Sequence, residues 1–328
     1  MKDVPKDLIN FIQTGEKFLV AGHRDPDGDC VGSQLTICSI LNRLGKEAIP
    51  CSAGPFKRTE IKPYERLFTL VSNENVPDKN VLNGAWVIIT DCNSLERTGE
   101  LAPYLENLPT AFIDHHYHPE DGGISSLDYI DPVAPSVTFM VLNLIRALGM
   151  ETSREEAELL LFGLCTDTGF FRHGDQDHAL SFEAAARLIY AGANPKKTYM
   201  AIYGGKSLES RYLIGRILNR AESHFNGRLI VSTEEYEDTQ TYGQESRDSD
   251  TIYQLLQSVA GVEAIVLIRQ EKPDNCSVGF RSLDQINVAA VAQSLGGGGH
   301  KNASGLSIAG TIKDVKIKIL AEFEKIFT

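Results

Sequence analysis

Short apolar runs, each followed by acidic or histidine side chains, recur through the first part of this chain and constrain its fold more than any other feature. They lie at residues 18–20, 87–89, 111–113 and 160–162, and each is β-like. Helix-like stretches separate them. Alternation of this kind is typical of an α/β domain built on a parallel sheet, which we expect to extend to about residue 190.

The side chains that follow these runs are ones that bind cations. In an open parallel sheet, residues just past the carboxyl ends of neighbouring strands converge on one crevice. Carboxylates at that density repel one another strongly unless cations neutralise them. The sequence therefore predicts a two-metal hydrolytic centre. Its candidate residues are His23, Asp27, Asp29, Asp91, Asp114, His115, His116 and Asp167.

The first of these groups lies in a turn rich in glycine and proline, ahead of a helix that we expect to open near residues 32–33. Pro26 stiffens this turn, and Gly28 lets the two flanking carboxylates point in different directions. Asp27 and Asp29 are therefore spaced to serve different metal ions.

Asp91 is the natural bridging ligand, because one carboxylate shared by two cations holds them about 3.5–4 Å apart. His115 and Asp167 would complete the coordination of the second ion. A ligand set dominated by oxygen, with two imidazoles, suits Mn²⁺ or Mg²⁺ better than a thiolate-seeking metal. We favour Mn²⁺, because imidazole nitrogen is a poor ligand for Mg²⁺.

Other histidine, cysteine and acidic residues have more ordinary explanations. A lone aspartate after a strand is more often a helix cap or turn former than a ligand, and we expect this of Asp25. The remaining histidines are expected on the surface or in the core, and the cysteines beside ligands as buried, inert thiols. The candidate ligands differ from these because they occur together at four expected strand ends. The residues set aside are His118, His173, His178, His224, Cys92 and Cys165.

Helix signals punctuate the first half of the chain. Serines at the start and glycines just past the end predict helices over residues 33–44 and 136–148. Ser153, with Glu156 three residues later, predicts a capping box at the start of a helix that runs toward residue 162. A further helix is expected over residues 181–191.

Glycine-rich breaks then divide the chain into domains. We expect a parallel-sheet domain over residues 1–191, a linker over 192–225 and a smaller α/β domain over 226–328. The linker contains an amphipathic stretch, 208–223, which we interpret as a helix connecting the domains. In the second domain, strands are expected at 228–233, 264–269 and 276–280, and helices near 250–259, 286–295 and 313–327.

The second domain also contains a run of four glycines that ends in His300. One glycine after a helix is an ordinary C-cap, but four exceed that need. Glycines with positive φ can direct consecutive backbone N–H groups into one concavity, so the run predicts an anion-binding nest. A guanidinium at the end of strand 276–280 would bind a phosphate or a base, whereas the alternative is a flexible loop with a solvated arginine. The residues of this predicted substrate site are Arg281, Ser282, Gly297, Gly298, Gly299 and His300.

Composition limits the classes of partner. A net charge of −12 argues against a long, non-specific grip on nucleic acid, but not against a short phosphorylated substrate. Six cysteines without Cys-x-x-Cys spacing indicate reduced thiols. The start of the chain lacks the apolar core of a signal peptide, and no run approaches the roughly 20 apolar residues that span a bilayer. We expect a cytoplasmic protein that does not enter a membrane.

The spacing of the candidate ligands resembles that of the DHH phosphoesterases. The matching blocks are His23-x-x-Pro26-Asp27-Gly28-Asp29-x-x-Gly32-Ser33, Asp91, Asp114-His115-His116 and Asp167-Thr168-Gly169. The resemblance covers nearly the whole chain, because the Gly-Gly-Gly-His and Arg-Ser segments resemble the type 1 DHH-associated domain of that family. Two departures, Cys30 where alanine is usual and the unusual Cys92, touch no predicted ligand.

The resemblance implies a role for each residue and an active site in a cleft between the domains. It implies one Mn²⁺ on His23, Asp27 and Asp91, and a second on Asp29, Asp91, His115 and Asp167. His116 would lie beside the phosphate near the leaving group, with Asp114 orienting that loop or serving a structural role. The glycine-rich and Arg-Ser segments would bind the far end of the substrate.

Within that family the sequence favours the compact oligoribonucleases, which act on very short RNAs and often also remove the 3′-phosphate from adenosine 3′,5′-bisphosphate. The glycine-rich histidine motif argues against pyrophosphatases, and the length argues against the single-stranded-DNA exonucleases. A soluble cyclic- or linear-dinucleotide phosphodiesterase is the alternative enzyme, and a nucleotide-binding regulator the non-enzymatic alternative. The expected partners are short RNA oligonucleotides or mononucleotide bisphosphates, and the oligomeric state stays open.

Overall fold

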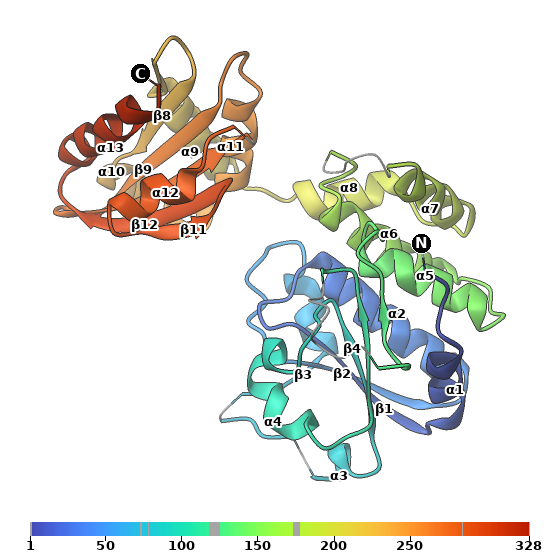
Figure 1. The fold of residues 1–328 in the computed structure, drawn as a ribbon. Coiled ribbons are helices and arrows are strands. Elements are labelled where there is room, and N and C mark those ends of the chain that lie inside the picture. Colours follow the sequence, from blue (N-terminus) through green and yellow to red (C-terminus); the bar gives the residue numbers. More distant parts are fainter. Residues whose placement is uncertain are drawn as a thin grey trace. The chain divides into compact units, whose positions relative to one another are not determined.

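A computed structural model of the protein describes residues 2–72, 74–77, 79–117, 125–172, 178–283 and 285–327. The chain divides into two compact units, Met1–Gly205 and Lys206–Thr328 (Figure 1). His118 and His173 lie outside the described residues. Among the residues described, no helix is long and apolar enough to cross a membrane.

The first unit is built on a parallel sheet with strand order β3-β2-β1-β4-β5-β6. Its strands are β1 (Lys17–Gly22), β2 (Glu47–Ser52), β3 (Thr69–Leu70), β4 (Trp86–Thr90), β5 (Thr110–Asp114) and β6 (Tyr129–Ile130). β1 lies between β2 and β4, so that Leu19 is paired with both Ile49 and Val87. The parallel α/β fold predicted from the sequence is confirmed.

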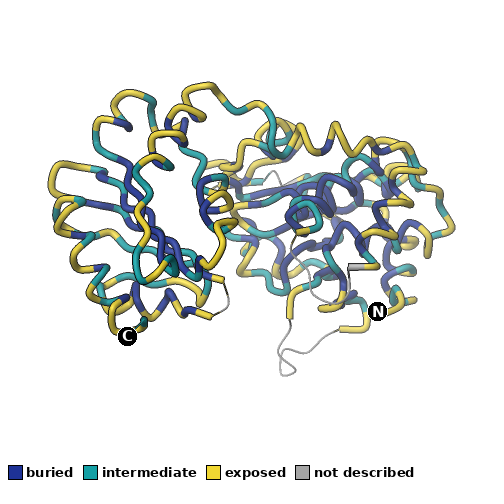
Figure 2. The backbone as a smooth tube through the Cα atoms, turned by 90° about the horizontal axis from the view of Figure 1, so that it is seen from above, coloured by how far each residue is buried: buried dark blue, intermediate teal, exposed yellow. Residues whose placement is uncertain are grey.

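Both faces of this sheet are covered, which is why its strands are apolar without a break. Phe18 and Val20 face one core, whereas Leu19 and Ala21 face the other, and Figure 2 shows these strands as buried segments. The longer helices are α1 (Lys6–Thr14), α2 (Gly28–Arg43), α5 (Val137–Ala147), α6 (Arg154–Asp167), α7 (His178–Tyr190) and α8 (Pro195–Tyr203). Shorter ones are η1 (Lys62–Leu67), α3 (Lys79–Leu82), η2 (Glu96–Leu101) and α4 (Ala102–Leu105).

Helix α2 begins earlier than the sequence predicts. It opens at Gly28 rather than near residues 32–33, because Asp27 caps it. One oxygen of Asp27, Oδ1, accepts hydrogen bonds from the backbone N–H groups of Asp29 at 3.0 Å and Cys30 at 3.1 Å. A carboxylate in this position satisfies N–H groups that have no partner inside the helix. Asp29 therefore lies in the first helical turn and not in a loop.

The prediction of a strand at residues 160–162 is wrong, because these residues lie within helix α6. The helix starts with the predicted capping box, in which Ser153 Oγ accepts from Glu156 N and a Glu156 oxygen accepts from Ser153 N. Its buried residues Ala157, Leu160 and Leu164 recur at helical spacing. A short apolar run does not by itself distinguish a strand from a buried helix segment. Asp167 therefore ends a helix rather than following a strand.

The second unit has a mixed sheet with strand order β11-β12-β10-β9-β8-β7, in which β8 and β9 are parallel. Its strands are β7 (Glu222–His224), β8 (Leu229–Glu234), β9 (Ala264–Lys272), β10 (Asn275–Ser282), β11 (Gly298–His300) and β12 (Ala303–Ala309). Its helices are α9 (Leu208–Asn219), α10 (Tyr236–Tyr242), η4 (Gln244–Ser246), α11 (Ser249–Gln257), α12 (Val288–Ser294) and α13 (Ile312–Phe327). The prediction of a second α/β fold is confirmed.

Helix α9 differs from the connector expected over 208–223. It ends at Asn219, and strand β7 occupies part of the remaining stretch. Its apolar face is buried in the second unit, where Leu213 and Ile217 pack in one core with Ile230 and Ile252. Its amphipathic pattern therefore reflects packing inside that unit.

Candidate metal centre

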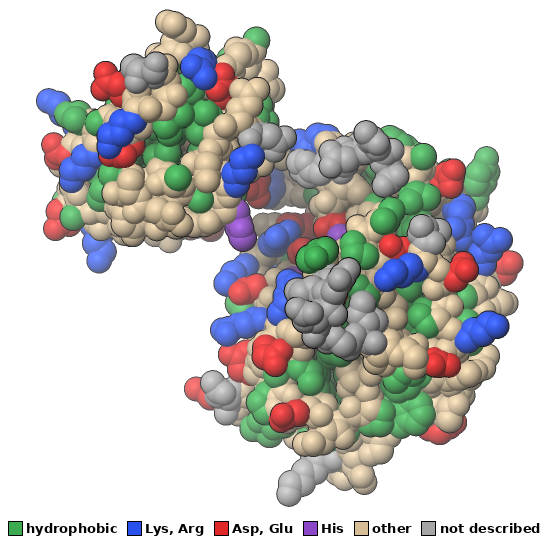
Figure 3. Space-filling model, viewed as in Figure 1, with side chains coloured by type: hydrophobic (Ala, Val, Ile, Leu, Met, Phe, Trp, Pro, Cys, Tyr) green, Lys and Arg blue, Asp and Glu red, His purple; other side chains and the backbone are tan. Residues whose placement is uncertain are grey.

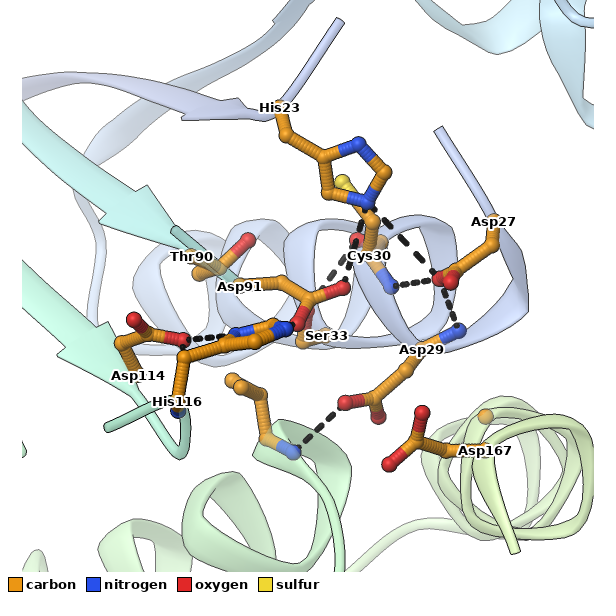
Figure 4. A network of polar contacts seen from close by, with 12 residues as sticks. His23, Asp27, Asp29, Cys30, Ser33, Thr90, Asp91, Asp114, His116 and Asp167 are labelled. Atoms are coloured by element: carbon orange, nitrogen blue, oxygen red, sulfur yellow. Dashed lines mark hydrogen bonds and ion pairs between the residues drawn. The ribbon is translucent and has the colours of Figure 1, made fainter. Parts of the chain in front are cut away.

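The predicted ligands come together at the ends of elements in the first unit (Figure 4). Three of them directly follow strands: His23 follows β1, Asp91 follows β4 and His115 follows β5. These three side chains therefore meet at strand ends, as the sequence predicts. Asp29 comes from the first turn of α2, and Asp167 from the last residue of α6. The centre is thus assembled from strand carboxyl ends and helix ends together.

Asp91 is at the middle of the group. Its Oδ2 lies 3.4 Å from Nε2 of His23, whereas its Oδ1 lies 3.8 Å from Nε2 of His115 and 3.7 Å from Nδ1 of His116. The residue is 2% exposed and has a left-handed backbone with φ of 61°, a conformation that aspartate tolerates better than most residues. Its two oxygens thus point toward two different sets of ligands, which is the geometry that a bridging carboxylate needs.

The imidazoles of His23 and His115 are oriented by backbone carbonyls. Nδ1 of His23 lies 2.8 Å from the carbonyl oxygen of Arg24, and Nδ1 of His115 lies 3.1 Å from that of Ala134. An Nδ1–H that donates to a carbonyl leaves Nε2 as the unprotonated nitrogen, which is the form that binds a metal. In both residues Nε2 faces the acidic group.

The start of helix α5 holds the carboxylate of Asp29. This side chain is fully buried and accepts hydrogen bonds from the backbone N–H groups of Val137 at 2.6 Å and Thr138 at 2.9 Å, and from the Thr138 hydroxyl at 2.6 Å. A helix N-terminus favours negative charge, so these contacts fix the carboxylate in place. One oxygen of Asp29 lies within 4.8 Å of ligand atoms of His115 and Asp167, which groups three donors around one point.

Burial and mutual repulsion shift the pKa values of three acidic groups upward in this centre. Burial raises the pKa values of Asp29, Asp91 and Asp167, and repulsion between the carboxylates adds to it, so that the pKa of Asp167 is about 7. Burial lowers the pKa of His115, but the surrounding carboxylates outweigh it and raise that pKa to about 8. Carboxylates that resist ionisation and imidazoles that retain protons are what a cation would relieve. The donor set therefore fits divalent metal ions.

His116 and Asp114 form a pair at the edge of the centre. Nδ1 of His116 lies 2.7 Å from Oδ1 of Asp114, and the same oxygen accepts a hydrogen bond from the His116 backbone N–H at 3.2 Å. Burial raises the pKa of Asp114, but the contacts with His116 outweigh this and lower it overall. Asp114 is fully buried, whereas the His116 side chain is 43% exposed. A buried carboxylate thus orients an imidazole whose other edge is accessible.

Cys30 belongs to this centre, although the sequence analysis expects it to touch no predicted ligand. Its Sγ lies within 4.8 Å of a ring nitrogen of His23 and a carboxylate oxygen of Asp91. The expectation that Cys30 touches no ligand is therefore wrong. The signal that could have revealed it is the early start of α2, which places Cys30 in the same first helical turn as Asp29.

In the second unit, Arg281 and His300 lie on one face of the sheet. Arg281 in β10 is paired with Ala303 in β12, which is paired in turn with His300 in β11, and directly opposed residues share a face. The guanidinium of Arg281 stacks 4.6 Å above the ring of Tyr253. Ser282 points to the other side, where it is buried and its hydroxyl donates to the Ile286 carbonyl at 2.7 Å.

The glycine run is not the nest of consecutive positive-φ residues that the sequence predicts. Only Gly296 and Gly299 in the run have positive φ, and the N–H groups of Gly296 and Gly297 donate to carbonyls of α12 at 3.1 and 2.7 Å. Gly298 and Gly299 belong to strand β11. A Cβ on Gly299 would lie 2.6 Å from Cα of Ser304, so this glycine permits close approach of β12.

Comparison with known proteins agrees with these features. The model of the DHH family N-terminal domain matches residues 17–164, and that of the DHHA1 domain matches residues 226–328. The bifunctional oligoribonuclease and PAP phosphatase NrnA of Thermus thermophilus is 32% identical over 292 residues, which cover 89% of this chain and 84% of NrnA. The chain belongs to the DHH family and carries a DHHA1 domain, so the family resemblance predicted from the sequence is confirmed.

Other relatives have names that indicate different activities. The cyclic-di-AMP phosphodiesterase PdeA of Listeria monocytogenes is 28% identical over 98% of this chain, which spans 48% of PdeA. Among solved structures, an exopolyphosphatase-related protein of Bacteroides fragilis has a TM-score of 0.83 at 22% identity and covers 100% of this chain and 98% of its own. The exonuclease RecJ bound to manganese has a TM-score of 0.53 at 16% identity, with 99% and 94% covered. At these identities the two structures support the fold alone.

Proposed function

We propose that this protein is a two-metal phosphoesterase that hydrolyses very short oligoribonucleotides. The observation that carries the proposal is the position of Asp91, whose two buried oxygens face His23 on one side and His115 and His116 on the other. A module that only binds nucleotides has no need for a bridging carboxylate between two cation sites. We therefore favour the enzyme over the nucleotide-binding regulator.

In this proposal His23, Asp27 and Asp91 hold one ion, and Asp29, Asp91, His115 and Asp167 hold the other. Manganese is the ion that we propose supports hydrolysis, and magnesium is the alternative, because the donors assigned here are mainly carboxylate oxygens with two imidazoles. When bound, such ions lower the pKa of water and neutralise charge that develops on a phosphoryl group.

The chain's own residues orient the reaction. Asp114 holds Nδ1 of His116 at 2.7 Å, which leaves Nε2 on the exposed side of the ring. We assign to His116 the contact with the reacting phosphate or the protonation of the leaving oxygen, and to Asp114 the orientation of His116. The hydrogen bonds from the start of α5 keep Asp29 in position, so that this ligand does not have to be ordered when the ions bind.

The second unit is proposed to bind the part of the substrate that does not react. Across β10, β12 and β11, one row of opposed residues is Gly279, Gly305 and Gly298, and the next row is Arg281, Ala303 and His300. In the first row, Tyr253 covers Gly279, where a Cβ would lie 2.1 Å from the tyrosine hydroxyl oxygen, whereas a Cβ on Gly298 would meet nothing within 4 Å. The open backbone at Gly298, bordered by a guanidinium and an imidazole, suits a base together with its phosphate. Gly297 and Gly299 support this surface by allowing the chain to lie close to β12, and Ser282 supports it through its hydrogen bond to the Ile286 carbonyl on the other face.

Short substrates fit the electrostatics of the protein better than long ones. The net charge is −12, and on the face shown in Figure 3 acidic and basic side chains are interspersed. Long strands bind proteins mainly through continuous basic surfaces. The 32% identity to an oligoribonuclease and PAP phosphatase supports short RNA as the substrate, with adenosine 3′,5′-bisphosphate as a further substrate. The 28% identity to a cyclic-di-AMP phosphodiesterase supports a cyclic dinucleotide as the second candidate substrate, and a linear dinucleotide stays an alternative.

A substrate panel with Mn²⁺ tests the proposal. It compares dinucleotides, pentanucleotides, 20-nucleotide RNA, cyclic dinucleotides, adenosine 3′,5′-bisphosphate and pyrophosphate at equal concentrations. We expect turnover of the short RNAs to exceed that of the 20-mer per end. Equal rates on short and long RNA would argue against the assignment, and hydrolysis of cyclic dinucleotides alone would favour the second candidate.

A further inference from the structure

Cys30 places a sulfur atom inside a centre that otherwise offers nitrogen and oxygen. Its Sγ, one ring nitrogen of His23 and one carboxylate oxygen of Asp91 all lie within 4.8 Å of one another. Figure 4 shows the sulfur beside the imidazole of His23, on the side of helix α2. Three kinds of donor thus surround one point in the metal position that we assign to His23, Asp27 and Asp91.

The position of the sulfur is fixed by the fold. The Cys30 thiol donates to Oε1 of Gln34 at 3.4 Å. A flip of the Gln34 side-chain amide would break two hydrogen bonds, because its Nε2 donates to the carbonyls of Val20 at 2.9 Å and Cys51 at 3.0 Å. The last residue of β1 makes room for the sulfur, since a Cβ on Gly22 would lie 2.2 Å from Sγ of Cys30.

Sulfur changes which cation such a position prefers. Mn²⁺ and Mg²⁺ favour oxygen ligands, whereas thiolate, imidazole and carboxylate together are typical of Zn²⁺. With bond lengths of about 2.0–2.3 Å, tetrahedral zinc has ligand atoms about 3.3–3.7 Å apart. Nε2 of His23 already lies 3.4 Å from Asp91 Oδ2 and 3.9 Å from Asp27 Oδ1.

We propose that Cys30 makes this position a mixed sulfur, nitrogen and oxygen site that binds Zn²⁺ in preference to Mn²⁺. On binding, the thiol gives its proton to solvent, its hydrogen bond to Gln34 is lost, and the sulfur becomes a fourth ligand beside His23, Asp91 and Asp27. Zinc then competes with manganese for this position. The inference rests on the proposed metal centre but not on the proposed substrate.

Cobalt and zinc binding to the full chain test this proposal. Wild type, Cys30→Ala, Cys30→Ser and Cys92→Ala are freed of metal and titrated with Co²⁺, and the thiolate-to-cobalt charge-transfer band is recorded. We expect the band in wild type and Cys92→Ala, and not in either Cys30 variant. Cys92 is the matched control because it is also a buried cysteine beside a ligand, but it lies outside the donor group of His23 and Asp91.

Zinc affinity is measured by competition with a chromophoric chelator, and manganese affinity in parallel. Mutation of a residue that hydrogen-bonds to a metal ligand typically lowers metal affinity about 10–100-fold. Loss of a direct ligand should therefore weaken zinc binding at least about tenfold. Manganese affinity should change much less. Thermal unfolding of each variant verifies that it is folded, and Cys30→Ser retains the size of the side chain.

A wild-type protein without the cobalt band, a band that persists in Cys30→Ala, or an unchanged ratio of zinc to manganese affinity would each overturn the inference. Manganese-dependent hydrolysis by wild type is measured separately. If wild type hydrolyses short RNA but shows no cobalt–thiolate band, this inference fails and the proposed function stands. If wild type binds cobalt through Cys30 but hydrolyses nothing, the proposed function fails instead.

Discussion

Replacing Asp167 by asparagine should stabilise the metal-free protein at alkaline pH. Burial, with repulsion from Asp29, raises the pKa of the Asp167 carboxyl from 3.8 to about 7. The folded state therefore holds this proton more tightly than the unfolded chain does. The stability that the group contributes is present at low pH and is lost as the pH rises from 3.8 through about 7. At pH 9 the ionised carboxylate opposes folding, and asparagine removes that charge.

The magnitude follows from the shift in pKa. A change from 3.8 to about 7 is about 3 pKa units, or an upper limit of about 4 kcal/mol at 1.36 kcal/mol per unit. The side chain is 27% exposed, and screening by water reduces the effect, so we expect about 2 kcal/mol. In a domain of 150–250 residues this corresponds to a rise in Tm of about 4–8 °C.

The assay is thermal unfolding after treatment with a chelator, at pH 9 and at pH 5. Asp167→Asn should melt higher than wild type at pH 9, with a smaller difference at pH 5, where the folded wild type is protonated. Added Mn²⁺ should raise the Tm of wild type at pH 9 more than that of Asp167→Asn. Glu106→Gln, which alters an exposed carboxylate, is the control. If Asp167→Asn melts no higher than wild type at pH 9 without metal, the carboxylates do not repel one another as argued.

Three further outcomes test the site. Asp91→Asn should reduce the metal content more than any other single ligand change, because both ions lose a ligand, and atomic spectrometry of dialysed protein measures this. The apparent Kd for Mn²⁺ should fall between pH 6 and pH 8, by up to about tenfold per pH unit for each proton released on binding. The reason is that the pKa values of Asp167 and His115 are about 7 and about 8. Calorimetry in buffers of different ionisation enthalpy counts the protons. Arg281→Ala should lower kcat/KM roughly ten- to hundredfold, for a loss of about 1.5–3 kcal/mol, mainly by raising KM. Its metal content should stay normal, and loss of metal in that variant would contradict the separation of substrate binding from the metal centre.

Sequence reasoning indicated which candidate ligands lie close together, because several of them follow strand ends, which apolar runs reveal. Strands β1, β4 and β5 were predictable, since residues buried on both faces form continuous apolar segments. Asp167 lies near the other candidate ligands, as expected, but it follows a buried helix and not a strand, because residues 160–162 are equally apolar in a helix. The start of α2 was missed because Asp27 serves as a cap as well as a ligand candidate.

The second unit shows what composition alone does not convey. Four consecutive glycines predict freedom in φ, but the run closes helix α12 and then forms strand β11 against β12. Glycine is needed here because two closely packed strands leave no space for a Cβ. A local sequence pattern does not distinguish this need from a need for positive φ. The row of Gly279, Gly305 and Gly298 depends on strand register, which becomes visible only when the sheet is known.

The metal centre also explains how the fold tolerates carboxylates that repel one another. Asp27 is held by the N–H groups at the start of α2, and Asp29 by those at the start of α5. Two helix N-termini therefore supply partial positive charge to Asp27 and Asp29. Among the described residues, no lysine or arginine side chain is hydrogen-bonded to either carboxylate. Because backbone groups hold these ligands, they stay in place without ions. Among the described residues, no helix N-terminus donates a hydrogen bond to the Asp91 carboxylate, so we expect its charge to depend most on bound cations, and we expect this residue to link metal binding to folding stability most strongly.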